Sequence, residues 1–133
     1  MRREVIEVDK PWTRTIGFSM GVVTQGRTLF TAGITARDPE GKLVGAGDMR
    51  AQIEQCFRNV GDILRAAGAD FGDVVKWTMF TTDIDAFSKH ADVYRRHFVN
   101  RPASTLVEVP RLVMPEMLVE IEAIASLPDK AGA

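Results

Sequence analysis

The sequence predicts one α+β domain, spanning residues 1–133, in which two helices pack on one face of a mixed β-sheet. A length of 133 residues is typical of a single domain. With 45% hydrophobic and 26% charged residues, the composition is that of an ordinary globular protein. Short β-prone runs alternate with longer helical patterns along the chain, which favours helices laid against a sheet.

Strands predominate in the N-terminal third. Residues 5–8 are partly alternating and predict a first strand. An irregular stretch follows at Pro11, which has no backbone N–H to donate. Residues 18–24 and 27–31 are two β-prone runs on either side of a glycine-containing turn, and this spacing predicts a β-hairpin.

The clearest helix is predicted over residues 49–67. Its apolar residues recur at spacings of three and four, the pattern of one helix face: Ile53, Phe57, Val60 and Leu64. Asp48 can cap the start of the helix, and Gly68 can end it in the left-handed conformation. Cys56 lies beside the apolar face, where we expect a buried, unreactive thiol because no nearby cation would stabilise the thiolate.

The C-terminal half predicts a strand, a helix and a second hairpin. Residues 74–82 are rich in β-branched and aromatic residues, which is typical of a central strand. A helix is expected over residues 84–99, and residues 106–109 and 118–125 form the last two strands. Because the strands carry apolar residues on both sides, the face without helices needs a cover, and another copy of the chain is the simplest one.

The composition argues against several classes of function. A formal net charge of −1, from 17 basic and 18 acidic residues, does not favour nucleic-acid binding, which normally needs a basic face. The single cysteine excludes an internal disulfide and a multi-cysteine zinc site. No apolar run approaches the roughly 20 residues of a membrane span, and no apolar signal core follows Met1, so we expect a cytoplasmic protein.

The sequence also lacks motifs for metal, nucleotide or serine chemistry. His90 and His97 stand seven residues apart on a predicted helix, about 10 Å between their backbones, so we expect surface histidines rather than a zinc site. Neither a Gly-rich phosphate loop nor a Gly-x-Ser-x-Gly elbow occurs. We therefore predict no metal and no cofactor.

Three glutamates interrupt strands that are otherwise largely apolar. Alternation puts Glu120 and Glu122 on one face of the last strand, and Glu108 interrupts the preceding strand in the same way. Because burying an ionised carboxylate is costly, such residues either face water or are held for use. A solvated face or a water-filled assembly centre would explain them. So would a carboxyl group in a semi-apolar cleft that exchanges protons with a substrate. The residue pattern does not choose among the three.

Five further segments recur in order over nearly the whole chain: residues 18–22, 29–33, 74–83, 101–109 and 119–125. Together they resemble the Rid family, also called YjgF-like. The resemblance implies a chorismate-mutase-like α+β subunit that forms a homotrimer with three ligand clefts between subunits. Archetypal members hydrolyse reactive enamines and imines, such as 2-aminoacrylate and its imine tautomer, to keto acids and ammonia. They use no metal and no organic cofactor.

The resemblance assigns roles to single residues. Glu120 falls on the acidic position that handles the water or the proton, which makes it the catalytic candidate. Gly33 falls on the glycine whose backbone lines the cleft. Phe18 replaces the usual tyrosine, so the ring is kept and its hydroxyl is lost. Ala91 and Leu106 stand where asparagine and cysteine are frequent.

Ser104 is the departure with the greatest consequence. Archetypal deaminases have an arginine at this position, which grips the substrate carboxylate through a bidentate, charge-assisted fork. The hydroxyls of Ser104 and Thr105 can each donate one hydrogen bond to a substrate, but they carry no charge. We therefore expect weak or no activity on 2-aminoacrylate-type acids. A neutral substrate, or one anchored elsewhere by Arg14 or Arg111, is favoured instead.

Two functional hypotheses remain open. The first is a cofactor-independent hydrolase of the imine- or enamine-deaminase type, with Glu120 transferring the proton. The second is a non-catalytic trimer that binds or senses a small metabolite, because the arginine, the asparagine and the tyrosyl hydroxyl are all replaced. Ribonuclease activity, claimed for some relatives, is not favoured, because the charge is near neutral and no His–His or His–Lys pair is placed for phosphodiester cleavage.

Overall fold

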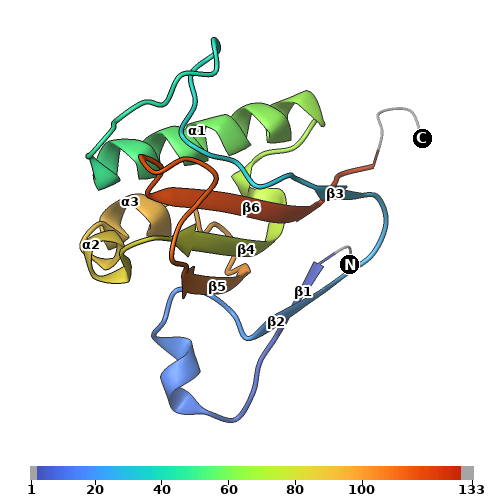
Figure 1. The fold of residues 1–133 in the computed structure, drawn as a ribbon. Coiled ribbons are helices and arrows are strands. Elements are labelled where there is room, and N and C mark those ends of the chain that lie inside the picture. The colour runs from blue at the N-terminus through green and yellow to red at the C-terminus, as the bar shows by residue number, and fades with distance from the viewer. Residues whose placement is uncertain (1–2, 130–133) are drawn as a thin grey trace.

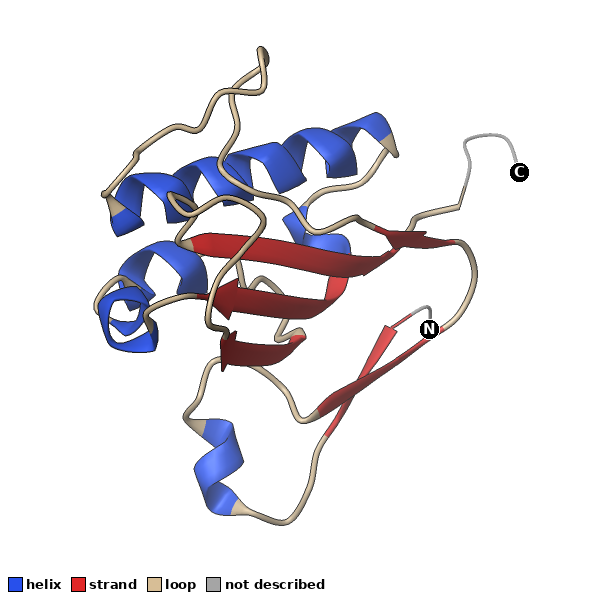
Figure 2. Ribbon diagram, in the orientation of Figure 1, coloured by secondary structure: helices blue, strands red, loops and turns tan. Residues whose placement is uncertain are grey.

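The structure is a computed structural model that describes residues 3–129, and within this range it contains a two-stranded and a four-stranded sheet (Figures 1 and 2). Its strands are β1 (Arg3–Ile6), β2 (Gly21–Thr24), β3 (Thr28–Phe30), β4 (Val74–Thr81), β5 (Ala103–Glu108) and β6 (Val119–Ser126). Its α-helices are α1 (Met49–Ala66), α2 (Ile84–Ser88) and α3 (Ala91–Arg95), and Pro11–Arg14 and Phe71–Asp73 form short 3-10 helices.

The four-stranded sheet is mixed and has the strand order β3-β6-β4-β5. β6 pairs antiparallel with both β3 and β4, whereas β4 and β5 run parallel. α1 packs against β6 and contacts α2 and α3, so the helices gather on one face of this sheet (Figure 1). The predicted α+β class, with helices on one face of a mixed sheet, is confirmed.

α1 matches its prediction at both ends and on its buried face. The Asp48 side chain accepts a hydrogen bond from the backbone N–H of Ala51 at 3.1 Å, and Gly68 ends the helix region with a φ of 78°. The apolar residues of the predicted face are fully buried. Cys56 is buried beside them. Burial raises the pKa of its thiol and the charge of Glu120 raises it further, so the thiol is unreactive as expected.

The two predicted hairpins do not form in the described chain. β2 pairs with β1, and β3 pairs with β6, so the strands on either side of Gly26 separate. β5 and β6 do not pair either, because β4 lies between them. The long alternating pattern of β6 offers cross-strand contacts to neighbours on both sides, and these distant pairings outweigh the local turn pattern.

The helix predicted over residues 84–99 is instead two short helices, α2 and α3, which are separated by Lys89 and His90. A straight helix would place Phe87 and Tyr94 about 10 Å apart along its axis. In the structure their rings stack with centroids 4.9 Å apart. The break therefore allows both aromatic side chains to pack against each other in the core.

His97 is half-buried in an aromatic cluster, which corrects the expectation of a surface histidine. Its ring stacks on Phe57 with centroids 4.2 Å apart and meets Phe71 edge-on at 4.8 Å. Its Nδ1 lies 3.0 Å from the carbonyl oxygen of Val93. Burial lowers the pKa of His97 from its ordinary value of 6.5, the Val93 hydrogen bond partly opposes this, and the charge of Arg96 lowers the pKa further.

The buried imidazole predicts that stability falls with acid. Because the folded-state pKa is depressed, the stabilisation is complete above the unfolded value of 6.5 and is lost as pH falls through the lower folded value. Urea unfolding at about pH 7.5 and about pH 5.5 measures this loss. His97→Gln should weaken the pH dependence and His90→Gln should not. An identical pH dependence in wild type and His97→Gln would contradict the prediction.

Candidate functional site

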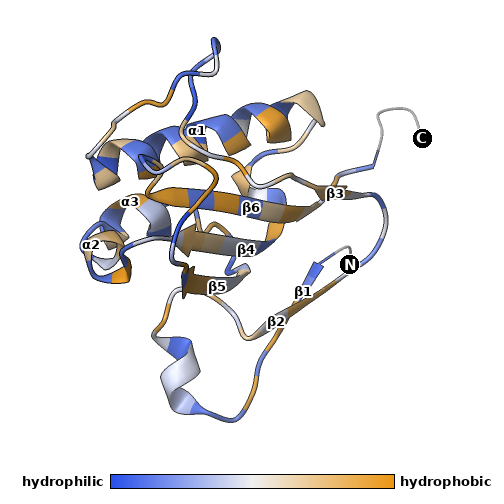
Figure 3. Cartoon of the chain, viewed as in Figure 1, coloured by the Kyte–Doolittle hydropathy of each residue, from blue (hydrophilic) through white to orange (hydrophobic). Residues whose placement is uncertain are grey.

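β6 carries two of the three glutamates and alternates as predicted. Val119, Ile121 and Ala123 are buried in the core, while Glu120 and Glu122 are half-buried on the opposite face. Figure 3 shows the hydrophilic breaks in the otherwise mainly hydrophobic ribbon of β6. The third carboxylate candidate, Glu108, is exposed at the end of β5. The three glutamates are thus in different environments.

Glu108 and Glu122 each have a neighbour that gives them a structural role. Oε1 of Glu108 accepts a hydrogen bond from the backbone N–H of Ile84 at 2.9 Å, at the start of α2. Glu122 lies close to Lys76 of β4: burial lowers the pKa of Lys76, and the charge of Glu122 partly opposes that shift. Glu108 therefore helps to start a helix, and Glu122 compensates a partly buried cation.

The surroundings of Glu120 differ from those of the other two glutamates. No described residue forms a hydrogen bond or ion pair with its carboxylate. It lines a groove of about 870 Å³ together with parts of the 33–39 segment, with Val113 and with polar side chains of α1: Gln55, Arg58, Asn59 and Asp62. This environment separates Glu120 from the other two glutamates, a distinction that the residue pattern left open.

A β-bulge lies next to Glu120. Phe30 pairs with Ile124, and Ile34 pairs with Ile121. Between these two pairs the 30–34 segment advances four residues while β6 advances three. The 30–34 segment therefore contains one extra residue. A bulge of this kind bends its strand and interrupts the ladder, and bulges are frequent beside active sites.

Thr31 repairs part of the interrupted ladder. Its N–H donates to the carbonyl oxygen of Ala123 and its Oγ1 accepts from the N–H of Ala123, both at 2.9 Å. The N–H of Gly33 takes no part in a backbone hydrogen bond within the described residues. It is therefore available to a ligand.

Gly33 leaves space for the Glu120 side chain. A Cβ atom at this position would overlap Oε2 of Glu120 and would lie 2.9 Å from its Cδ. The φ of Gly33 is not in the left-handed region, so the glycine is required for space rather than for its backbone conformation. Glu120 and Gly33, two of the predicted site residues, are thus in direct contact.

Phe18 and Ser104 meet in a second, smaller concavity of about 110 Å³, which Leu106 also lines. Ser19 holds the two segments together: its N–H donates to the carbonyl oxygen of Pro102 at 2.9 Å, and its hydroxyl donates to that of Arg101 at 2.7 Å. The remaining lining side chains are Met79, Tyr94, Arg95 and Phe98.

Ser104 and Thr105 lie on opposite faces of β5, because successive side chains of a strand alternate. Ser104 lines the small pocket, whereas Oγ1 of Thr105 accepts a hydrogen bond from Nζ of Lys76 at 2.6 Å on the other face. The structure therefore does not bring the two hydroxyls together in one site.

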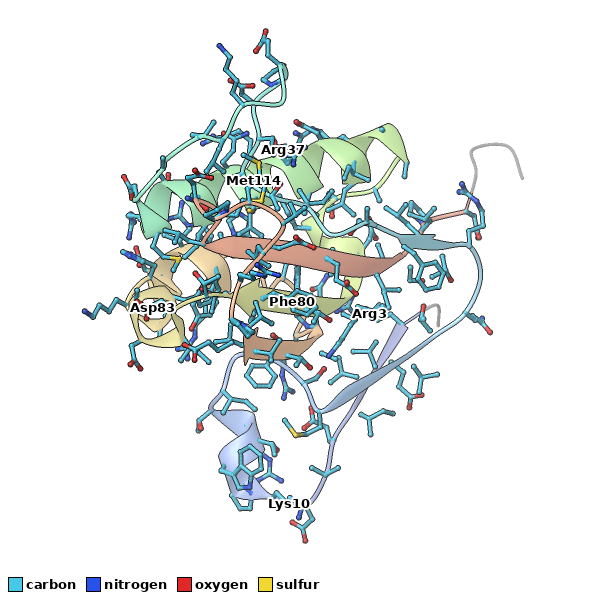
Figure 4. The ribbon with its side chains drawn as sticks, in the orientation of Figure 1. Arg3, Lys10, Arg37, Phe80, Asp83 and Met114 are labelled. Carbon is cyan, nitrogen blue, oxygen red and sulfur yellow. The ribbon has the colours of Figure 1, made fainter. Side chains whose placement is uncertain are left out.

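The arginines near the two concavities differ from those considered from the sequence. Arg14 and Arg111 line neither the groove nor the small pocket. Arg37 and Arg58 line the groove, and Figure 4 shows Arg37 beside Met114, with Nη2 lying 4.0 Å from the sulfur. Arg95 lines the small pocket. These residues come from a loop and from helix surfaces, where hydrophobic periodicity gives no signal.

The groove and the small pocket share no lining residue within the described subunit. Glu120 and Gly33 belong to the groove, and Phe18 and Ser104 belong to the pocket. One subunit thus presents the predicted residues as two separate groups.

Neither metal ligation nor membrane insertion finds a candidate between residues 3 and 129. No three His, Cys, Asp or Glu side chains in this range are grouped so that they could hold a metal ion. None of the helices in the same range combines the length and the apolar character needed to cross a bilayer.

Comparison with known proteins identifies relatives over almost the whole chain. A sequence profile of the family described as Endoribonuclease L-PSP matches residues 12–127. A RutC family protein from Pyrococcus abyssi is 37% identical over 126 residues, which cover 94% of this chain and 98% of that protein. The 2-iminobutanoate/2-iminopropanoate deaminase of Rattus norvegicus is 34% identical over 124 residues, covering 92% of this chain and 89% of the relative.

A solved structure agrees with these sequence matches. YyfB from Yersinia pestis, a Rid family protein of unknown function, has a TM-score of 0.82 at 34% identity, and the match covers 96% of this chain and 100% of that one. The chain belongs to the Rid family. The resemblance carried by the five sequence segments is thereby confirmed, together with the Rid-type subunit fold. Because members of the family are described variously as endoribonucleases, RutC family proteins and imine deaminases, membership alone does not define the reaction.

The contact between Gly33 and Glu120 predicts an energetic coupling. Gly33→Ala should cost about 1 kcal/mol of unfolding free energy, because the Glu120 carboxylate must move to admit the methyl group. In a Glu120→Ala background the obstructing atoms are gone, so the same substitution should be neutral or slightly stabilising. Denaturant unfolding of the wild type, both single variants and the double variant measures the coupling. An equal cost of Gly33→Ala in both backgrounds would rule it out.

Proposed function

We propose that three copies of the chain form a homotrimer in which the groove of one subunit meets the small pocket of the next. The separation of the two residue groups within one subunit supports this arrangement. An interface that joins two different patches is heterologous, and it forms a closed ring when the rotation between subunits permits. Three identical clefts for a small metabolite would result.

The sheet face opposite the helices supports an assembly as well. Phe30 and Val107 lie on this face by their register with Ile124 and Phe80, and they are 70% and 37% exposed. Exposed large apolar side chains that lie on one face are typical of a surface covered by another protein. A neighbouring subunit would remove both from water.

In each cleft we propose that an imine or enamine of a small metabolite is hydrolysed, with Glu120 as the group that transfers protons. An enamine takes up a proton on carbon and becomes the protonated imine. Water then adds to the C=N carbon while the Glu120 carboxylate accepts a proton from the water, which gives a neutral carbinolamine. The carboxyl group returns this proton to the nitrogen, and as the C–N bond breaks the carboxylate takes the hydroxyl proton, which leaves a carbonyl compound and an amine, or ammonia.

The observation that carries this proposal is the position of the Glu120 carboxylate. It lines the groove without a hydrogen bond or ion pair from a described residue, and it touches Gly33, whose N–H is available to hold a substrate atom. Proton transfer needs a carboxylate that is near the substrate and not already engaged. The 34% identity to an imine deaminase favours the same class of reaction.

A non-catalytic trimer that binds or senses a small metabolite is the second candidate. It is favoured by the small pocket, where Phe18 and Leu106 present apolar surface and Ser104 brings no charge to a substrate. On this basis 2-aminoacrylate-type acids should be poor substrates, unless a residue other than Ser104 holds their carboxylate.

Glu120→Gln tests the catalytic proposal with almost no change in shape. Turnover should fall by at least about 100-fold, because an amide cannot accept and return the proton. Ammonia release can be measured with 2-iminobutanoate generated by an amino-acid oxidase, and with neutral imines as a second substrate class. Light scattering should show the same oligomer as the wild type.

Glu122→Gln is the matched control, because it removes a carboxylate from the same face of the same strand. This variant should retain turnover within about threefold of the wild type. Unchanged turnover in Glu120→Gln would refute the catalytic role. Retention of a small ligand with no turnover on either class of imine would favour the binding trimer.

A further inference from the structure

The small pocket combines apolar walls with polar groups that have no partner. Phe18, Phe98 and Leu106 contribute aromatic and aliphatic surface to its lining. One water takes up about 30 Å³ in the liquid, so 110 Å³ corresponds to about four waters or to an organic molecule of about the same size. A few polar groups converging on an apolar concavity are the usual composition of a small-molecule site.

Two hydroxyl groups line this pocket. Tyr94 is 9% exposed and packs against Phe87 and Phe98, with ring centroids at 4.9 Å and 5.9 Å. Neither its hydroxyl nor that of Ser104 forms a hydrogen bond with a described residue. Both hydroxyls are therefore free to donate a hydrogen bond to a ligand oxygen in this pocket.

Arg95 is the cation of the pocket among the described lining residues. Other arginines are engaged: Arg50 pairs with Asp92 at 2.8 Å, and Arg101 pairs with Glu7. The Arg95 guanidinium forms no hydrogen bond or ion pair with a described residue. An unpaired guanidinium beside two unpaired hydroxyls is a donor set that suits a carboxylate, which can accept two parallel hydrogen bonds from the guanidinium.

We propose that Arg95 binds the carboxylate of a small organic acid in this pocket, with the Tyr94 and Ser104 hydroxyls donating further hydrogen bonds. The ligand class is a small monocarboxylic acid, because the guanidinium and the two hydroxyls together form a donor set for one carboxylate. The inference rests on the proposed function insofar as this pocket forms one half of the cleft. It deepens that function by naming the anchor: an acid held by Arg95 of α3 rather than from position 104 of β5.

Pyruvate and its amide, pyruvamide, are suitable probes because they differ mainly in charge. Calorimetric titration of the full-length protein should show that pyruvate binds more tightly than pyruvamide. Arg95→Gln should weaken pyruvate binding by about 10- to 100-fold and leave pyruvamide binding within about twofold, because a charge-assisted fork is lost. Arg95→Lys should recover part of the affinity, since it keeps the charge without the planar fork.

Arg96→Gln is the matched control. Arg96 is the next residue in the chain and carries the same charge, but it lines a different hollow together with His97 and its Nε donates to the carbonyl oxygen of Asp92. This variant should keep wild-type affinity for pyruvate. The proposal is overturned if Arg95→Gln retains that affinity, if Arg96→Gln loses it equally, or if pyruvate binds no more tightly than pyruvamide.

Glu120→Gln separates this inference from the proposed function. If Glu120→Gln still turns over imines while Arg95→Gln loses its affinity for pyruvate, the catalytic role of Glu120 is refuted and the role of Arg95 as anchor is retained. Loss of turnover in Glu120→Gln, with unchanged pyruvate affinity in Arg95→Gln, would support the reaction and reject the anchor.

Discussion

The two-sided pairing of β6 is the constraint on which the rest of the structure depends. β6 lies between β3 and β4, and its alternation buries Val119, Ile121 and Ala123 on the side of α1. A register shift of one residue would exchange the two faces of the strand and would push carboxylates into the core. Burying an unpaired carboxylate costs several kcal/mol, so the same alternation that builds the core also fixes where Glu120 lies.

The bulge beside β6 shows how a regular sheet accommodates an irregular site. An extra residue between Phe30 and Ile34 interrupts the ladder, and the Thr31 hydroxyl replaces one of the lost acceptors. The same irregularity leaves the Gly33 N–H unpaired and makes room for the Glu120 side chain. A lost backbone hydrogen bond thus leaves an unpaired donor next to a carboxylate without a partner in the described chain, which is the arrangement that the proposed role of Glu120 requires.

Local patterns in the sequence predicted the features that depend on neighbouring residues, such as buried faces and strand alternation. They could not predict which strands pair with each other. The buried face of α1 and the alternation of β6 follow from periodicity, and both are confirmed. The two hairpins were wrong because short turns only suggest neighbours, whereas the strands pair with other partners: β2 with β1, β3 with β6 and β5 with β4. The bulge leaves no mark in the hydrophobic pattern. The opposite faces of Ser104 and Thr105, by contrast, follow from strand alternation and could have been predicted.

Dividing the site between subunits links ligand binding to assembly in the proposed trimer. In a single subunit the groove and the pocket are open to water. Two unit charges 4 Å apart in water interact by only about 1 kcal/mol. Near a protein surface, where the effective dielectric constant is about 20, the same two charges interact by about 4 kcal/mol. Closing the cleft would therefore strengthen the electrostatic interactions of Glu120 and Arg95 with a bound molecule. A ligand that touches both halves binds the ring and not the separate subunits, so it stabilises the ring by mass action. Under this proposal the ring, rather than the subunit, is the smallest unit that binds an acid through Arg95 and transfers a proton through Glu120.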